Sequence, residues 1–400
     1  MAGHASRLIF CAFPEGIRTK DFIMDYKTEP AAAGRALLFA SAATWIEGDA
    51  VRQLEQAAER NGVTAVAGLP DLHPGRYGPV GSAILSDDVV HPDLIGTDIG
   101  CGMALFSLDM PARRVKAEKA ADRMRSLGAE WTDEAMKAGH TEGFQTGHEA
   151  ALGTVGGGNH FCELQAVHEI VDAEAAASAG IGAANALLLV HSGSRSLGAA
   201  TFERHWNGSS SGSNLDGPGA NYLRDHDVAL AFAALNRRLV ATRAAEALRC
   251  DLAPLLDVPH NFAETLGGAV LHRKGAAPAD RGLVPVPGSR GAFTYILQPL
   301  DGDPRALHTI AHGAGRKHDR RWMEAKAKHG KESHDRLVRN PIGSRVVCDD
   351  QKLAVEESHV AYKDIETVIA DLQAFGLARV VAVTRPMVTY KSDGQGRDRR

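Results

Sequence analysis

Hydrophobic residues along this chain fall mainly into short runs, and loops rich in glycine, proline and aspartate separate these runs. Each run has the length of one β-strand. The pattern therefore predicts strands at residues 63–67, 80–85, 103–108, 161–167, 186–190, 283–286, 293–297 and 379–383.

Other segments carry apolar residues at the spacing of three and four that is typical of one helix face. These segments predict helices at residues 31–60, 112–127, 225–248, 320–338 and 364–375. The predicted helices and strands do not alternate regularly, and no repeat of fixed period is present. We therefore expect an α+β fold with mixed β-sheets flanked by helices, and not a doubly wound sheet.

One segment has the composition of a flexible loop. Residues 206–220 read WNGSSSGSNLDGPGA, which is rich in glycine and serine. Chemically suggestive residues lie on both sides of it, so we interpret it as a flexible insertion loop and not as a domain boundary. The sequence contains no other convincing linker. Residues 1–400 are predicted to form a single compact domain.

The composition indicates a soluble cytoplasmic protein. Hydrophobic residues make up 44% of the chain and charged residues 24%, which is an ordinary balance for a globular protein. Five scattered cysteines without paired spacing exclude a disulfide framework and fit a reducing compartment. The first residues do not resemble a signal peptide. The apolar run 183–190 is far shorter than the roughly 20 residues of a membrane span.

The net charge of −4 gives no indication of nucleic-acid binding, but one segment is basic. Residues 316–345 contain ten Lys and Arg against four Asp and Glu. Two explanations fit this excess equally: a solvated helix face, or a track for a polyanion.

Glycine is more abundant than usual, and its position suggests a site built from loops. The 42 glycines are about one residue in ten, against roughly 7% in average proteins. Many of them lie beside histidine, asparagine or aspartate, in the segments 91–103, 153–165, 190–198, 258–264, 271–276, 287–297 and 311–316. Most of these segments adjoin a predicted strand, so we expect the sheets to gather them at their edges.

Five residues of these loops are of metal-ligand type. They are Asp98, Cys101, His160, His191 and His260. A carboxylate, a thiolate and imidazoles together suit a divalent transition metal. Five ligands are more than one tetrahedral ion takes, so a thiolate that bridges two ions would explain the set. The alternative is that these are unrelated loop residues and that Cys101 is a small buried side chain. The donor types by themselves favour zinc or copper over manganese, but they do not choose the ion.

His312, in the segment AHGAGR, is a candidate nucleophile. A histidine that attacks phosphorus forms a phosphoramidate, and Arg316 is placed to neutralise phosphate charge. The alternative is a structural histidine in a turn. The segments SGSR (192–195) and PGSRG (287–291) offer backbone N–H groups to anions. GTVGGGNH is not a Walker loop, because no Gly-Lys-Ser/Thr follows it.

In this order, these loops resemble the RtcB family of RNA ligases. The motifs that carry the resemblance are DIGCGM, GGGNHF, HSGSR, HRKGA, PGS and HGAGR. The resemblance runs from GLPDLHPG (68–75) to RPMVTYK (385–391), which is about four-fifths of the chain.

The resemblance implies a role for individual residues. By it, Asp98, Cys101, His160, His191 and His260 bind two manganese ions, with Cys101 as the bridge, and His312 accepts GMP from GTP. The residues that it assigns to the nucleotide are Asn159, Glu163, Ser289, His312, Arg316, Tyr362 and Lys391. It also places Arg195 in an anion-binding loop.

The implied activity is GTP-dependent ligation in RNA repair or tRNA splicing. RNA with a 3′-phosphate or a 2′,3′-cyclic phosphate would be joined to RNA with a 5′-hydroxyl. Two other classes of protein fit the same residues: a two-metal phosphoesterase without a nucleotide, and a non-catalytic RNA-binding paralogue. Guanylylation of His312 separates the ligase from the phosphoesterase, and the retention of all five ligands and of His312 argues against the paralogue.

The sequence also departs from the family pattern. Arg290 stands where a methionine is common, and Asp319-Arg320 replaces a Ser-Arg pair. We expect the acid at 319 to weaken a phosphate contact and Arg290 to restore positive charge. With the short chain, these features resemble a bacterial branch that is encoded beside a release-factor-like protein (release factor H). That branch implies the release-factor-like protein as a pathway partner and broken ribosomal RNA as the substrate.

Overall fold

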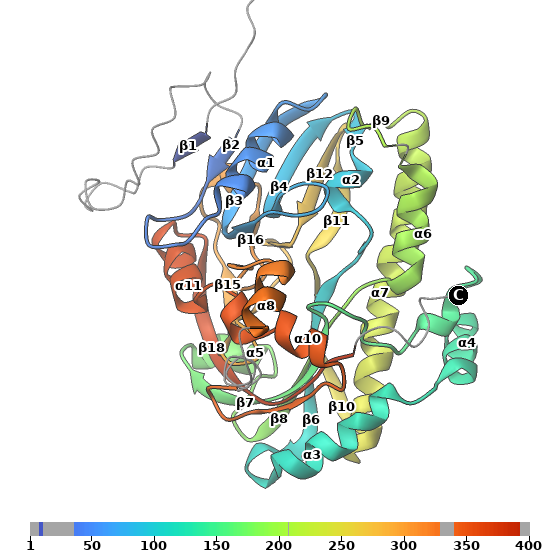
Figure 1. The fold of residues 1–400 in the computed structure, drawn as a ribbon, viewed down its shortest axis with the longest axis vertical. Helices are drawn as coiled ribbons and strands as arrows, with labels where there is room; N and C mark the ends of the chain where they lie inside the picture. The colour runs from blue at the N-terminus through green and yellow to red at the C-terminus, as the bar shows by residue number, and fades with distance from the viewer. Residues whose placement is uncertain (1–7, 11–35, 207, 329–339, 393–400) are drawn as a thin grey trace, which may run out of the picture.

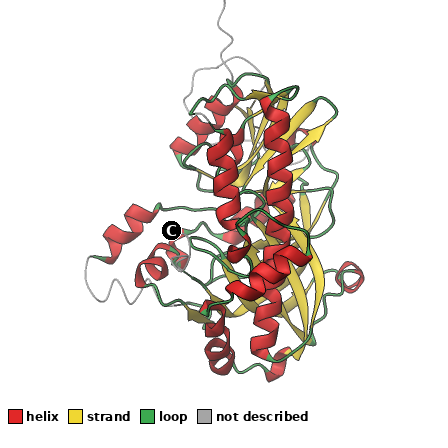
Figure 2. Ribbon diagram, turned by 90° about the vertical axis from the view of Figure 1, so that its right-hand side faces the viewer, coloured by secondary structure: helices red, strands yellow, loops and turns green. Residues whose placement is uncertain are grey.

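The computed structural model describes residues 8–10, 36–206, 208–328 and 340–392. Its strands form two large mixed or antiparallel sheets, one above the other in Figure 1. Figure 2, turned by a quarter, shows two long helices running beside the strands, with further helices packed around the lower sheet. The α+β class predicted from the sequence is confirmed.

The first sheet combines parallel and antiparallel pairs. Its strand β2 runs parallel to both β1 and β3, and the pairs from β3 to β11 are antiparallel. In spatial order the strands are β1 (Leu8–Phe10), β2 (Ala36–Leu38), β3 (Val63–His73), β4 (Val80–Asp87), β12 (Ala269–Lys274) and β11 (Asn261–Leu266).

The second sheet is antiparallel along its main path, and β17 (Arg345–Val347) adds to it by running parallel to β18. In spatial order the strands of the path are β10 (Leu252–Pro259), β6 (Gly102–Pro111), β8 (Asn185–Ser192), β7 (Phe161–Ile170), β18 (Ala378–Tyr390), β15 (Thr294–Pro299) and β14 (Val284–Pro287). Two short ribbons complete the β structure, and they pair β13 (Ala276–Pro278) with β16 (Thr309–Ala311) and β5 (Val89–Val90) with β9 (Ser213–Asn214).

The helices are α1 (Gly48–Ala58), α2 (Pro92–Ile95), α3 (Ala117–Met124), α4 (Thr132–Thr141), α5 (Ala173–Ser178), α6 (Arg195–His205), α7 (Pro218–Leu248), α8 (Arg320–Ala327), α10 (Gln351–Glu356) and α11 (Ile365–Ala374). The long helix α7 packs Val240 and Ala244 against Leu188 and Val190 of the second sheet. Within the described ranges, no helix has both the length and the hydrophobicity needed to cross a membrane.

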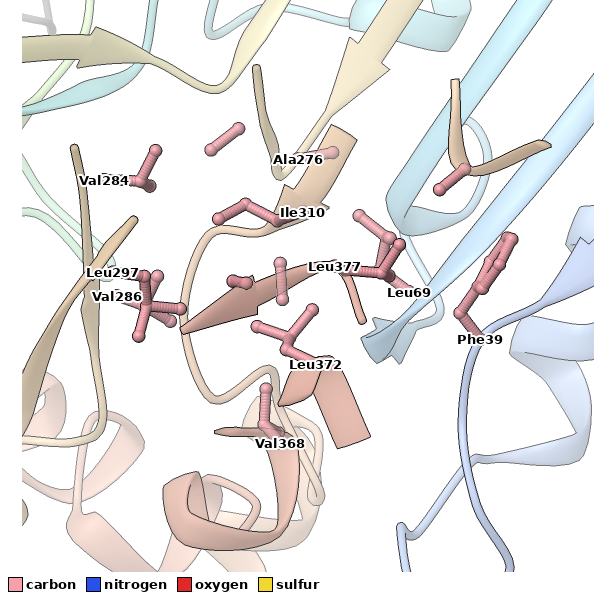
Figure 3. Packing of buried hydrophobic residues seen from close by; sticks show 14 of the residues in the cluster. Phe39, Leu69, Ala276, Val284, Val286, Leu297, Ile310, Val368, Leu372 and Leu377 are labelled. Atoms are coloured by element: carbon pink, nitrogen blue, oxygen red, sulfur yellow. The ribbon is translucent and has the colours of Figure 1, made fainter. Parts of the chain in front are cut away.

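The two sheets share one hydrophobic core. Phe39 and Leu69, from the side of the first sheet, belong to the same cluster as Val286 and Leu297 of the second sheet, and Leu372 of α11 lies between the two pairs (Figure 3). Each of these side chains is almost completely buried, which is the main source of stabilisation at such a junction. The functional loops are therefore held by a rigid support.

The eight predicted strands are all present. Most extend further than predicted: β3 continues to His73 and β18 continues to Tyr390. Leu283 and Phe293 lie one residue outside their strands. These extensions matter because they carry side chains to the edge of the functional site.

The prediction of a helix at 31–60 is wrong for most of its described part. Ala36–Leu38 form the strand β2, with Leu37 paired to Ala67, and the helix α1 covers only Gly48–Ala58. Residues 31–35 lie outside the described residues. All three residues of β2 are buried, whereas a surface helix buries only one face. The pairing of β2 with β1 on one side and with β3 on the other therefore overrides the helical spacing.

Three other predicted segments need correction or extension. The helix predicted at 112–127 is α-helical only in α3, because Val115 is extended and short 3₁₀ turns stand at both ends. Of the segment 320–338, α8 ends at Ala327, and residues 329–339 lie outside the described residues. The segment 206–220 contains β9 and the first turn of α7, and its mobility stays a prediction.

Candidate metal centre and adjoining cavity

Strand register brings four of the predicted ligands to one edge of the second sheet. Gly102 at the start of β6 pairs with Ser192 at the end of β8 and with Pro259 at the end of β10. Phe161 at the start of β7 pairs with His191. Cys101, His160 and His260 each precede or follow one of these paired residues, so all of them meet His191 at the same edge.

The five ligand side chains form two groups that share Cys101. Each group is able to hold a metal ion: Asp98, Cys101 and His160 make one, and Cys101, His191 and His260 make the other. The Cys101 Sγ lies 3.2 Å from His160 Nε2 and 3.0 Å from His191 Nε2. His160 Nε2 lies 2.9 Å from Asp98 Oδ2, and His191 Nε2 lies 3.2 Å from His260 Nε2.

These contacts are better explained by a shared cation than by hydrogen bonds. His191 Nδ1 faces the carbonyl oxygen of Asn159 at 3.2 Å, and a carbonyl only accepts, so Nδ1 carries the proton and Nε2 presents a lone pair. Burial holds the pKa values of His191 and His260 well below the usual range for histidine, so both rings are neutral. Neutral nitrogens that converge on a sulfur suit a transition-metal ion.

The same environment shifts the pKa values of Cys101 and Asp98. Burial, followed by the nearby Asp98 carboxylate, raises the pKa of the Cys101 thiol well above its usual range. Burial also acts to raise the pKa of Asp98, but His160 outweighs it and holds that pKa below the usual range. A cation would reverse the effect on Cys101, because thiolate ligands are stabilised by the metal charge. The donor set therefore fits a metal centre.

Residues outside the ligand set hold the loops in place. Arg237 of α7 is buried, and its guanidinium donates to the carbonyls of Gly100 (2.6 Å) and Ser192 (3.0 Å). Asn261 Nδ2 donates to the carbonyl of Asp98 at 2.6 Å. Gly193 has no room for a side chain, because a Cβ there would overlap the Asp98 carboxylate. The carbonyl contacts fix the backbone on which Asp98 and Cys101 stand.

His312 lies immediately after β16 and is bound to a buried carboxylate. Asp71 of β3 accepts hydrogen bonds from the His312 backbone N–H (3.1 Å) and from its Nδ1 (2.7 Å). In the neutral ring, a proton on Nδ1 leaves the lone pair on Nε2. The His312 and His260 ring centroids are 4.6 Å apart. The Cβ of any side chain at Gly315 would overlap the backbone of Asp71, which explains a glycine there.

His312 forms part of the wall between two cavities. One cavity, of 260 Å³, is lined by the ligands Asp98, Cys101 and His260. The other, of 330 Å³, extends towards α8 and β18. Asn159 and His312 line both. The second cavity is lined by all seven residues that the sequence assigned to the nucleotide: Asn159, Glu163, Ser289, His312, Arg316, Tyr362 and Lys391.

The 330 Å³ cavity is lined in part by a cluster of charged and polar groups, which we call the charged wall: Arg316, Glu357, Tyr362 and Lys391. Arg316 NH1 forms a 2.9 Å ion pair with Glu357 Oε1, and Tyr362 Oη donates to Glu357 Oε2. Burial would raise the pKa of Glu357, but Lys391 and Arg316 hold it below the usual range. Burial lowers the pKa of Lys391, whose Nζ donates to the His160 carbonyl at 2.9 Å.

Glu163 is buried in the lining of the same cavity, on strand β7, where it pairs with Thr389 of β18. Gln165 Nε2 donates to its Oε1 at 2.7 Å, and Thr389 Oγ1 donates to its Oε2. Burial outweighs these hydrogen bonds and raises the pKa of Glu163 to about 7. The carboxyl group therefore changes its charge near neutral pH. Ser289 Oγ accepts from the Gly291 N–H at 3.2 Å within the loop between β14 and β15.

The structure also places Arg195, Arg290 and Asp319. Arg195 begins α6 and lines a third cavity, which reaches Asp98 and His160 from the other side. Arg290 is buried and lines the 330 Å³ cavity. Asp319 caps α8 by accepting from the Trp322 N–H at 2.6 Å, so its carboxylate serves the helix and does not line the cavity.

Asp71, Glu357 and Arg237 were not identified from the sequence. Asp71 lies in GLPDLHPG, where a lone acid within an apolar strand was the available signal. Glu357 lies in a run of two glutamates that gives no local indication of burial. Arg237 lies in a helix that looks amphipathic, and nothing nearby indicates its distant partners.

Comparison with known proteins agrees with this geometry. The model of the family described as tRNA-splicing ligase RtcB matches residues 53–142 and 129–392. RNA-splicing ligase RtcB2 of Escherichia coli is 41% identical over 360 residues, which cover 88% of this chain and 94% of that protein. RNA-splicing ligase RtcB of Mycobacterium tuberculosis is 28% identical over 423 residues, with 82% and 97% covered. tRNA-splicing ligase RtcB of Nanoarchaeum equitans is 27% identical, with 81% and 87% covered.

Proposed function

Because the chain belongs to the tRNA-splicing ligase RtcB family, we propose that it is a GTP-dependent RNA ligase that acts through GMP bound to His312. Its substrates would be an RNA 3′-phosphate or 2′,3′-cyclic phosphate and an RNA 5′-hydroxyl. The observation that carries the proposal is the position of His312, which is held by Asp71 in the wall between the ligand cluster and the nucleotide cavity.

The two ligand groups would hold two metal ions with Cys101 as their common ligand. Bound ions would neutralise phosphate charge and orient the reacting oxygens. Manganese follows from the family resemblance, whereas thiolate and imidazole donors by themselves favour zinc or copper. Measuring guanylylation with each metal in turn decides between them.

The nucleotide would occupy the 330 Å³ cavity. Glu163 offers a carboxylate acceptor and Lys391 an ammonium donor, and this combination suits the N–H groups and the carbonyl of guanine. Tyr362 offers an aromatic surface for the base. Arg316 and the backbone N–H groups near Ser289 would receive phosphate oxygens.

The chain's own residues account for the transfer of GMP. The lone pair of His312 Nε2 attacks the α-phosphorus, the bond to pyrophosphate breaks, and a phosphoramidate forms. Asp71 keeps the proton on Nδ1 and stabilises the charge that develops on the ring. An oxygen of the RNA 3′-phosphate then attacks the phosphorus and releases His312. Finally the RNA 5′-hydroxyl attacks the activated 3′-phosphate, loses its proton and displaces GMP. A cyclic phosphate would first be opened by water.

The test is labelling with α-³²P-GTP in the presence of Mn²⁺, followed by a denaturing gel. The parent protein should retain an acid-labile label that His312→Ala abolishes. His140→Ala is a matched control, because His140 is exposed on α4. Ligation should require a 3′-phosphate and a 5′-hydroxyl. Removal of the RNA phosphate without any labelled protein would instead identify a phosphoesterase.

A further inference from the structure

Beside the nucleotide cavity, aromatic and basic side chains form a row on the surface. Trp45 lies against Lys317, with Nζ 5.9 Å from the ring centroid. His318 stacks on Trp322 at 3.8 Å with an interplanar angle of 12°. Lys326 Nζ lies 5.6 Å from the Trp322 centroid. We call these five residues the aromatic–basic row.

The two tryptophans of the row are exposed although their neighbours are buried. Trp45 is 52% exposed, while Thr44 and Ile46 on either side of it are buried. Trp322 is 40% exposed, while the next residue, Met323, is completely buried. The buried neighbours therefore hold the backbone in place, and both indole rings stay exposed at the surface. Exposed aromatic rings with flanking charges are typical of binding surfaces.

The row is fixed to the nucleotide cavity by backbone hydrogen bonds. The N–H groups of Lys317 and His318 both donate to the Ala361 carbonyl, at 2.8 and 3.2 Å. Arg316, which lines the cavity, donates from Nε to the His318 carbonyl at 3.2 Å. A ligand that leaves the cavity over Arg316 would therefore reach His318 and Trp322 next.

The charge of this surface suits a polyanion. Residues 316–328 contain six Lys and Arg against two acids. Both acids have local partners: Asp319 caps α8, and Glu324 pairs with Lys352 at 3.0 Å. Lys317 and Lys326, by contrast, face aromatic rings. The positive charge is thus presented together with flat apolar surfaces.

We propose that the aromatic–basic row binds the single-stranded RNA that adjoins the ends to be joined, and this rests on the proposed ligase function. Bases would stack on Trp322 and Trp45, and phosphates would contact Lys317 and Lys326. Alternating rings and cations match the alternating bases and phosphates of a single strand, and such stacking tolerates any base sequence. A protein ligand would not need this alternation.

The test is the affinity of full-length protein for a 12-nucleotide single-stranded RNA with a 3′-phosphate, measured by fluorescence anisotropy. Trp322→Ala should weaken binding about tenfold, while Trp322→Phe, which keeps a stacking surface, should restore most of the affinity. Leu266→Ala is the control, because Leu266 is 51% exposed and far from the row in sequence. Changing Lys317 and Lys326 together to Gln should reduce the salt dependence of binding by roughly one phosphate contact or more.

Self-labelling with GTP in the absence of RNA separates the two hypotheses. If Trp322→Ala labels normally but binds RNA weakly, the row is an RNA site. If it labels normally and binds RNA as tightly as the parent, the RNA site is wrong and the ligase proposal stands. If the parent binds RNA through Trp322 but takes no label under any metal, the ligase proposal fails and the RNA site does not.

Discussion

The ligand cluster and the charged wall line two cavities that share His312, and they differ in how their polar groups are satisfied. In the ligand cluster, the nitrogens of His191 and His260 and the sulfur of Cys101 converge although none of them is charged in a metal-free site. In the charged wall, the partly exposed Arg316 forms an ion pair with the buried Glu357, so the two charges already neutralise each other.

This difference determines what each region requires of a ligand. In the ligand cluster, neutral donor atoms converge on one point, and such an arrangement favours a cation. In the charged wall, Arg316 already has a carboxylate partner, so a phosphate bound there would share Arg316 with Glu357. The first region should respond to substitution by losing its ligand, and the second by losing stability.

The largest effect is expected at Cys101, which belongs to both ligand groups. Cys101→Ala should leave less than one metal ion per chain, as measured by elemental mass spectrometry. Guanylylation should fall by more than the roughly 10–100-fold caused by changing a residue that only supports a ligand. Cys250→Ala is the control, since Cys250 lies outside the cluster. A Cys101→Ala protein that keeps two ions would show that Cys101 is not the ligand shared by the two groups.

The next effect concerns Asp71, which holds His312 by hydrogen bonds. Asp71→Asn should reduce the guanylylation rate by about 100- to 10,000-fold, as in other His–Asp pairs, while metal content stays unchanged. The amide N–H can donate to Nδ1 of His312 and so place the ring proton on the nucleophilic Nε2. An unchanged rate, with thermal denaturation confirming the fold, would show that Asp71 does not orient His312.

The free energy of unfolding should fall more when the carboxylate of a largely buried ion pair is removed than when that of an exposed ion pair is removed. Glu357→Gln leaves the charge of Arg316 buried and should lower the free energy of unfolding by about 3 kcal/mol. Glu118→Gln removes a partner of Arg345 at the surface, where both side chains are more than half exposed, and should change it by less than about 1 kcal/mol.

Urea denaturation with and without GTP extends this measurement. Phosphate should compensate the unpaired Arg316, so GTP should stabilise Glu357→Gln more than the parent. Equal stabilisation of the two proteins would mean that the phosphates do not reach Arg316.

The last effect is the pH dependence due to Glu163, which should not exceed the effect of Glu357→Gln. Its pKa is about 7 in the folded protein against an ordinary value of 4.5 for glutamate, so between these two pH values the folded state holds a proton that the unfolded state has lost. This stabilisation is present in full below about pH 4.5 and disappears as the pH rises through about 7. It amounts to about 3 kcal/mol at most.

Comparison with Glu163→Gln isolates that contribution. The stability of the parent relative to the variant should fall between pH 5 and pH 8, and the KM for GTP should fall a few-fold in the parent only as the carboxylate ionises. Parallel pH profiles for the two proteins would show that Glu163 does not titrate in this range.

The local features of this protein can be identified from its sequence alone. Strands such as β6 and β8 are short apolar runs between glycine-rich loops, and such runs can be identified without knowledge of their neighbours. The ligand types of Cys101 and His191 were likewise apparent from the loops that contain them. The resemblance to one family ordered these loops and assigned the nucleotide residues, which the structure brings around one cavity.

The features that depend on residues distant in the sequence are apparent only in the tertiary structure. Residues 36–38 have helical spacing but become a strand because β1 and β3 pair on both sides of them. The strands β10, β11 and β12 were not predicted, since they are defined less by their composition than by pairing: β10 with β6, β11 with β12, and β12 with β4. Asp71 lies 241 residues before His312. Contacts over such separations arise only when the core packs the sheets together, so no local pattern of residues reveals them.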